Sequence, residues 1–180
     1  ISQLMKNIPG PDFPTGGIIM GMDNLKQGYN KGRGSIRIRG EIEEESLKNG
    51  KERLVIKSIP YQVNKSLLVE KIAHLARDKK VEGISDLRDE SDKDGIRIVI
   101  ECKKDAIAAI VLNNLFKYSQ LQDTFGANML SLIDGAPQVM NLKTMLTHFL
   151  DFRREVIIKR TQFELKEAEN KAHLLEGLKI

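Results

Sequence analysis

The chain has 180 residues, of which 41% are hydrophobic and 30% are charged, a balance typical of folded globular proteins and not of disordered ones. This length suffices for one domain with an appendage or for two small domains. No run of about 18 apolar residues exists, which excludes a membrane-spanning helix. A single cysteine, Cys102, excludes an internal disulfide and favours a reducing cytosolic setting. Because the chain starts on Ile1 and closes on Ile180 without a stop signal, we expect it to be a piece of a longer protein.

The charges are sorted into blocks along the chain. The net charge of +4 is mild, so it permits a nucleic-acid partner without requiring one. Residues 26–40 contain five cations and no acid, and four glutamates follow within residues 41–45. Residues 82–94 contain six acids and two cations. This arrangement predicts one positive and one negative face.

The first half of the chain predicts an irregular connector followed by two strands. Prolines and glycines gather in residues 7–17, so we expect residues 1–30 to be irregular. From Ser35 apolar and charged residues alternate, which predicts a strand, and residues 52–59 predict a second one. Asn49-Gly50 between them is a turn signal. A two-residue loop there would place Ile56 opposite Glu43 and mix the two faces, so a longer loop or a bulge is expected.

Helices and further strands alternate after this pair. We expect a helix that Asn64 caps and that ends near residue 80, then strands at 84–88 and 96–102. Asp105 is expected to cap a second helix, and residues 121–133 to be extended. The order predicts an α+β fold in which an antiparallel or mixed sheet carries helices on one face, with residues 31–137 as its domain.

Residues 138–180 predict a long C-terminal helix. From Asn141 onward apolar residues recur every three, four or seven positions without proline, as far as about Glu176. Such a helix would be roughly 54 Å long at 1.5 Å per residue. A small sheet domain cannot cover it, so we expect it to pack on a returning helix or on another subunit.

Several patterns that suggest catalytic or metal sites have simpler interpretations. Residues 90–101 approach a calcium loop, but Glu90 at the first position, Arg97 at the eighth and strand-like alternation favour an acidic hairpin turn. The glycines at 16–17 and 32–34 lack the lysine and helix of a phosphate loop. Three histidines lie too far apart in sequence for a zinc site, namely His74, His148 and His173. Three tyrosines are interpreted as packing residues with solvated hydroxyls, namely Tyr29, Tyr61 and Tyr118.

The basic strand is the best positive signal for function. Arg33, Arg37 and Arg39 lie two or four residues apart, so they share one face of a strand, and Lys31 extends the series. Such a series can follow duplex phosphates, whereas 5% aromatics and no tryptophan fit poorly with stacking on single strands. The alternative, which periodicity alone leaves open, is a solvated face that the glutamates of residues 41–45 neutralise.

Several long motifs closely resemble the A subunits of bacterial DNA gyrases, which are type IIA topoisomerases. They lie at residues 8–17, 32–35, 59–65, 82–92, 112–115, 124–130 and 160–165. The likeness runs nearly end to end. The related topoisomerase IV A subunits share part of the pattern, but residues 61–65 and 124–126 look more like gyrase.

This resemblance implies that residues 31–137 are the tower domain and that residues 138–180 begin the coiled coil toward the exit gate. The family's nucleophile is a tyrosine directly preceded by arginine. No tyrosine here has that neighbour, so we expect no catalytic residue, no metal site and no cofactor in this chain. The resemblance also implies that the gyrase B subunit binds magnesium and ATP, and that the enzyme is an A2B2 assembly in the cytoplasm, on the chromosome.

In that family, negative supercoiling depends on a double-strand break, on the passage of a second duplex and on rejoining at the expense of ATP. The implied role of this chain is to hold and bend the cleaved duplex through Lys31, Arg33, Arg37, Arg39 and Lys65, with no membrane involved. Two other functions stay open, a stand-alone module that binds duplex DNA and a scaffold whose long helix mediates assembly.

Overall fold

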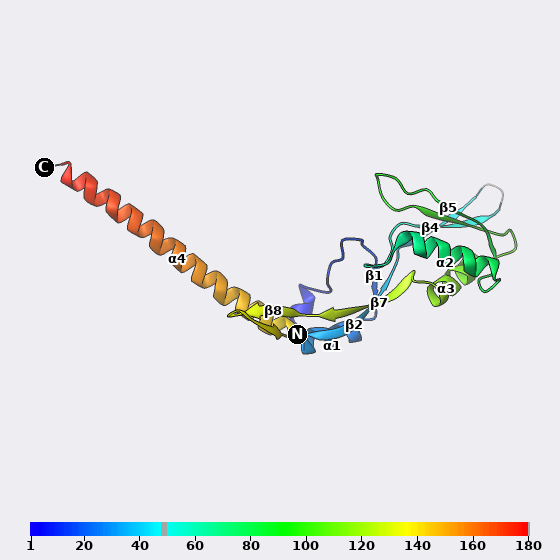
Figure 1. Cartoon of the computed structure of the whole chain (residues 1–180), viewed down its shortest axis with the longest axis horizontal. Coiled ribbons are helices and arrows are strands. Elements are labelled where there is room, and N and C mark those ends of the chain that lie inside the picture. Colours follow the sequence, from blue (N-terminus) through cyan, green and yellow to red (C-terminus); the bar gives the residue numbers. More distant parts are fainter. Residues whose placement is uncertain (48–49, 180) are drawn as a thin grey trace.

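The computed structural model describes residues 1–47 and 50–179, which form an elongated molecule (Figure 1). The predicted α+β class is confirmed, since antiparallel strands and helices are followed by a long C-terminal helix. The described strands form three separate sheets and not one. The division into residues 1–30, 31–137 and 138–180 stays a prediction.

The first sheet has three strands in the order β1-β2-β7: β1 (Ile18–Met20), β2 (Arg33–Arg39) and β7 (Gln122–Asn128). Helix α1 (Met22–Lys31) packs Leu25 and Tyr29, one turn apart, against Ile36 and Ile38 of β2. The prediction that residues 1–30 are irregular is therefore wrong for β1, α1 and the short 3-10 helix η1 (Leu4–Lys6). Residues 22–31 contain too few apolar residues for sequence periodicity alone to indicate a helix. Their helical face is defined only by the core residues on which Leu25 and Tyr29 pack.

The second sheet has four strands in the order β3-β4-β6-β5: β3 (Ile42–Ser46), β4 (Glu52–Ile56), β6 (Ile98–Cys102) and β5 (Ile84–Asp89). Helices α2 (Lys65–Arg77) and α3 (Ala108–Tyr118) cover one face of it, as predicted, and share its main hydrophobic core (Figure 1). Ile42 pairs with Ile56, so the loop is longer than two residues, as expected. Asn49 of that loop lies outside the described residues.

Gly40 marks the point where the chain leaves the first sheet for the second. The expected single strand from Ser35 through the glutamates is therefore wrong, because β2 and β3 belong to different sheets. At this junction the Gly40 N–H donates to the Leu121 carbonyl at 2.9 Å. A Cβ on Gly40 would lie 2.4 Å from the Ser58 carbonyl oxygen, so three chain segments meet here at a distance that only glycine allows. The predicted second strand is also too long, because β4 ends at Ile56 and not at residue 59.

Of the two predicted helix caps, Asn64 is confirmed and Asp105 is not, and the structure adds a third cap at Asn141. The Asn64 side chain accepts a hydrogen bond from the Leu67 N–H at 3.1 Å, and the Asn141 side chain accepts one from the Thr144 N–H at 2.8 Å. The Asp105 cap is wrong, because α3 begins at Ala108. The Ala108 N–H donates instead to a carboxylate oxygen of Glu52 on β4, at 3.1 Å. A carboxylate from a distant strand thus replaces the local cap.

The chain ends in a hairpin and a long helix that extends away from both larger sheets (Figure 1). The hairpin pairs β8 (Leu130–Ile133) with β9 (Ala136–Val139), and α4 (Leu142–Gly177) follows. The 36 residues of α4 span about 54 Å, as predicted. Along α4 large apolar side chains such as Phe152 and Phe163 are exposed. Among the described residues, no helix combines the length and the apolar character needed to cross a bilayer.

Candidate nucleic-acid interface

The outer face of the three-stranded sheet carries the arginines that the sequence singled out. Arg33 and Arg37 are exposed, whereas Ile36 and Ile38 between and beside them are buried against α1. Arg33, Arg37 and Arg39 therefore share the face opposite α1. At about 3.3 Å per residue, the stretch from Arg33 to Arg39 spans roughly 20 Å. We call these three arginines together with Lys31 the basic row.

Uncharged residues surround the arginines on both neighbouring strands. The β7 residues directly opposite Arg33, Arg37 and Arg39 are Asn128, Thr124 and Gln122. On the other side, Met20 and Ile18 of β1 lie opposite Arg37 and Arg39. No carboxylate therefore stands directly across either ladder from an arginine of the row.

Lys31 precedes the strand and belongs to α1, at its last position. Gly32 ends the helix with a φ of 75° and donates its N–H to the Gly28 carbonyl at 2.7 Å. A Cβ on Gly32 would lie 2.3 Å from the Met140 carbonyl oxygen, so only glycine fits this turn. The turn leads directly from Lys31 into Arg33, which places Lys31 at the end of the row and not on the sheet face itself.

Arg39 is the most constrained member of the row. Its Nε donates to Oε1 of Gln122 at 2.5 Å, and its guanidinium carbon lies 4.4 Å from the centre of the Phe116 ring. A guanidinium has five N–H donors, so this geometry fixes the group and leaves donors for a phosphate. Sequence reasoning missed both partners, and Gln122 is 83 residues away, so no local pattern could have found it.

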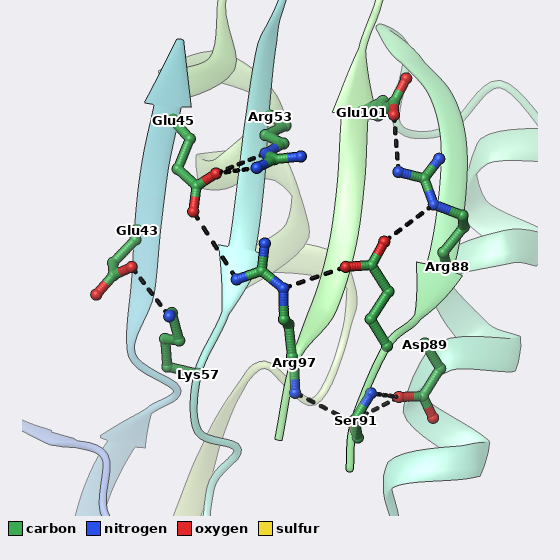
Figure 2. Close-up of polar contacts among 10 residues, drawn as sticks. Glu43, Glu45, Arg53, Lys57, Arg88, Asp89, Ser91, Arg97 and Glu101 are labelled. Atoms are coloured by element: carbon green, nitrogen blue, oxygen red, sulfur yellow. Dashed lines mark hydrogen bonds and ion pairs between the residues drawn. The ribbon is translucent and has the colours of Figure 1, made fainter. Parts of the chain in front are cut away.

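Two of the four glutamates that follow the row pair elsewhere. Glu43 pairs with Lys57 at 3.2 Å and Glu45 with Arg53 at 2.5 Å (Figure 2). Within residues 1–47 and 50–179, no carboxylate lies within ion-pair distance of any member of the basic row. The alternative in which these glutamates neutralise the row is thus not realised in the described structure.

The outer face of the four-stranded sheet carries an ion-pair network that neutralises itself. Arg97 bridges Glu45 and Glu90, at 3.9 and 3.1 Å, and Arg88 contacts Glu90 at 3.2 Å. Arg88 also pairs with Glu101 at 2.8 Å and with Asp86, contacts that raise its pKa. Figure 2 shows Glu45, Arg97, Arg88 and Glu101 spread across the strands of this face.

Two valines are completely buried beneath this network. Val55 and Val99 pair with each other on neighbouring strands and point away from the core that α2 and α3 cover. Their burial comes from the aliphatic stems of the charged side chains above them. Because acids and bases alternate there, this face offers a duplex little net attraction.

Lys65, also predicted to bind DNA, lies apart from the row. It opens α2, and its Nζ is 2.7 Å from a carboxylate oxygen of Asp89. The contact with Lys65 is the largest cause of the lowered pKa of Asp89, and hydrogen bonds from Ser91 lower it further. Asp89 therefore competes with any phosphate for the Lys65 ammonium group.

The other candidate sites have structural roles. Asp92 and Gly95 form the bridge of a hairpin turn between β5 and β6, which confirms the acidic-turn interpretation. Among the described residues, no group of three metal-binding side chains could hold an ion. Burial raises the pKa of Tyr29, and the Tyr61 ring lies 5.6 and 5.9 Å from the rings of Phe13 and Phe125, which are 5.1 Å from each other. Both tyrosines are packing residues.

Comparison with known proteins identifies one family over the whole chain. The family described as the A subunit of DNA gyrase/topoisomerase IV matches residues 1–180. The DNA gyrase A subunit of Clostridium acetobutylicum is 57% identical over 180 residues, and those of Salmonella typhimurium and Escherichia coli K12 are 54% and 53% identical over 181. All of this chain is covered in each case, but it spans only 22%, 21% and 21% of these relatives.

Proposed function

The chain belongs to the family of DNA gyrase/topoisomerase IV A subunits, and from this membership we propose that it is the part of a type IIA topoisomerase that supports duplex DNA beside the cleavage site. In this proposal the two larger sheets with α1, α2 and α3 form the tower domain. Helix α4 begins the coiled coil that leads to the exit gate. The names of the relatives favour gyrase over topoisomerase IV.

The observation that carries the proposal is the basic row, whose charges have no acidic partner among the described residues while the neighbouring face neutralises itself. Its roughly 20 Å match the axial length of about six phosphates of one DNA strand. Arginines on a rigid strand grip phosphates without reading bases, because base edges are reached only within the grooves. The basic row can therefore hold a duplex of any sequence, and can keep it bent.

The chemistry is assigned to other parts of the enzyme. The nucleophile in this proposal is a tyrosine outside this chain, and the gyrase B subunit binds magnesium and ATP. Strand breakage, duplex passage and negative supercoiling belong to an A2B2 assembly with two copies of the A subunit, which acts on the chromosome in the cytoplasm. The 180-residue chain alone is then expected neither to cleave nor to relax supercoiled plasmid. Relaxation by the purified chain, even in the presence of ATP and the gyrase B subunit, would refute this assignment.

The test of DNA binding is the salt dependence of affinity for a duplex of mixed sequence. Each phosphate contact contributes about 0.9 to the slope of log K against log salt concentration. Replacing Lys31, Arg33, Arg37 and Arg39 by alanine should therefore lower the slope by roughly 3–4. Lys65→Ala should change it by less, because Asp89 competes for that ammonium group. An unchanged slope in the fourfold variant means that the basic row does not bind DNA.

Matched controls remove, one at a time, four cations that lie elsewhere. Arg53, Lys57, Arg88 and Arg97 belong to the ion-pair network. Single replacements of these residues by glutamine change the net charge as single replacements in the row do, but they should leave the salt slope unchanged. A slope that follows net charge alone, whichever cation is removed, would contradict the assignment to the row.

A further inference from the structure

The end of α3 contacts the basic row at Arg39. Phe116, on which the Arg39 guanidinium rests at 4.4 Å, lies in the last turn of α3. The helix ends at Tyr118, and after three residues the chain enters β7 at Gln122, the hydrogen-bond partner of Arg39. In Figure 1, β7 connects the end of α3 with the strand that carries the row. The last turn of α3 thus contacts Arg39 in space, through Phe116, and is close along the chain to Gln122, the partner of Arg39.

Two lysines converge on the final residue of this helix. The Nζ atoms of Lys80 and Lys117 lie 4.9 and 5.1 Å from the centre of the Tyr118 ring. Lys80 comes from the loop after α2 and Lys117 from α3 itself, so two separate segments bring their charges to one ring. Both lysines are exposed, and neither has an acidic partner within the described residues.

We propose that Lys80 and Lys117, held on Tyr118, form a second phosphate-binding site that extends the duplex track from β2 onto the end of α3. This inference rests on the proposed function, because it assigns the continuation of the same DNA surface. Arg39, fixed by Gln122 and Phe116, is the link between the two parts. The track then runs from Lys31 at the start of the three-stranded sheet to Lys80 at the four-stranded unit.

A purely structural role for the two lysines makes a different prediction. Cations near a helix C-terminus stabilise it by interacting with its dipole, and each also gains from the ring face. If that were their only role, replacing them would change the stability of the chain and leave its affinity for DNA unaltered. A DNA readout therefore separates the two roles.

The experiment measures salt slopes for two double variants of the whole 180-residue chain, with a mixed-sequence duplex of about 30 base pairs, roughly 100 Å long at 3.4 Å per pair. We expect Lys80→Gln with Lys117→Gln to lower the slope by about 2, as Arg33→Gln with Arg37→Gln should. The control is Lys93→Gln with Lys166→Gln, since both lysines are exposed on other elements, and it should leave the slope unchanged.

The outcomes are distinguishable. If only the arginine variant lowers the slope, the extension is overturned and the proposed function stands. If neither variant does so, the proposed function fails and the extension fails with it. If only the lysine variant lowers the slope, DNA binds at the end of α3, and the assignment of DNA binding to the basic row is wrong.

A second measurement needs no variant. Acetylation of wild-type lysines, read by mass spectrometry, should slow several-fold at Lys80 and Lys117 when the duplex is present and stay constant at Lys166. Equal rates with and without the duplex would overturn the extension.

Discussion

Replacing Gly40 by alanine is a sharp test of how the two larger sheets are joined. Gly40 lies directly after Arg39, at the crossing from β2 to β3. An added Cβ would meet the Ser58 carbonyl oxygen at 2.4 Å and a methyl carbon of Leu121 at 3.1 Å. Because one of these neighbours is backbone, the strain cannot be relieved by rotating a side chain. The segments at the junction must move apart.

The size of the effect follows from these contacts. Overpacking of this kind costs about 1–3 kcal/mol. The Gly40–Leu121 hydrogen bond, at 2.9 Å, would lengthen and lose part of a contribution of about 1 kcal/mol. Alanine also lowers the conformational entropy of the unfolded chain, which stabilises the folded state by about 0.4–1 kcal/mol. The free energy of unfolding should therefore fall by about 2 kcal/mol, and Tm by roughly 4–8 °C for a chain of this size.

The assay is urea and thermal unfolding followed by circular dichroism, with Gly126→Ala as the matched control. Gly126 also lies in a strand of the first sheet, but a Cβ there would meet nothing within 4 Å. This control should be neutral or stabilised by up to about 1 kcal/mol. If both variants have the same stability, the close approach at Gly40 does not exist and the reasoning about the junction is wrong.

Three further predictions concern other parts of the chain. The pKa of Asp89 is lowered, chiefly by Lys65. The Asp89 carboxylate therefore adds to the free energy of unfolding above its unfolded pKa of about 3.9, and this contribution is lost as pH falls through the folded pKa. Asp89→Asn should therefore flatten the acid loss of stability in urea titrations below about pH 4; an unchanged profile contradicts the pairing. Val99→Ala should cost about 2 kcal/mol in the same assay, whereas a loss under about 0.5 kcal/mol would mean that the ion pairs above it do not exclude water. Asn141→Ala should cost about 1 kcal/mol and speed amide exchange at Thr144; unchanged exchange rules out the cap.

Some local features were predicted correctly from local signals in the sequence. Asn64 caps α2, as predicted, because its side-chain oxygen accepts from an N–H only three residues later and needs no distant partner. The alternation around Ile36 and Ile38 placed the arginines on one face, because the period of a strand is two wherever one face is buried. The length of α4 followed from its uninterrupted apolar repeat.

Features that depend on distant residues could not be predicted in this way. Glu52 replaced Asp105 at the start of α3 from 56 residues away, and Gln122 fixes Arg39 from 83 residues away. The break at Gly40 depends on where Ser58 packs, which no alternation pattern contains. The candidate site was therefore predictable as a row of charges, but its link to α3 was not.

The most direct test of the central claim is a footprint of the arginines on the wild-type chain. Phenylglyoxal modifies exposed guanidinium groups, and mass spectrometry reads the rate at each arginine with and without a duplex. Arg33 and Arg37 should be protected several-fold by DNA, while Arg154 on the exposed helix α4 should react at the same rate in both conditions. Unprotected Arg33 and Arg37 at a saturating duplex concentration would show that this face of the sheet does not hold DNA.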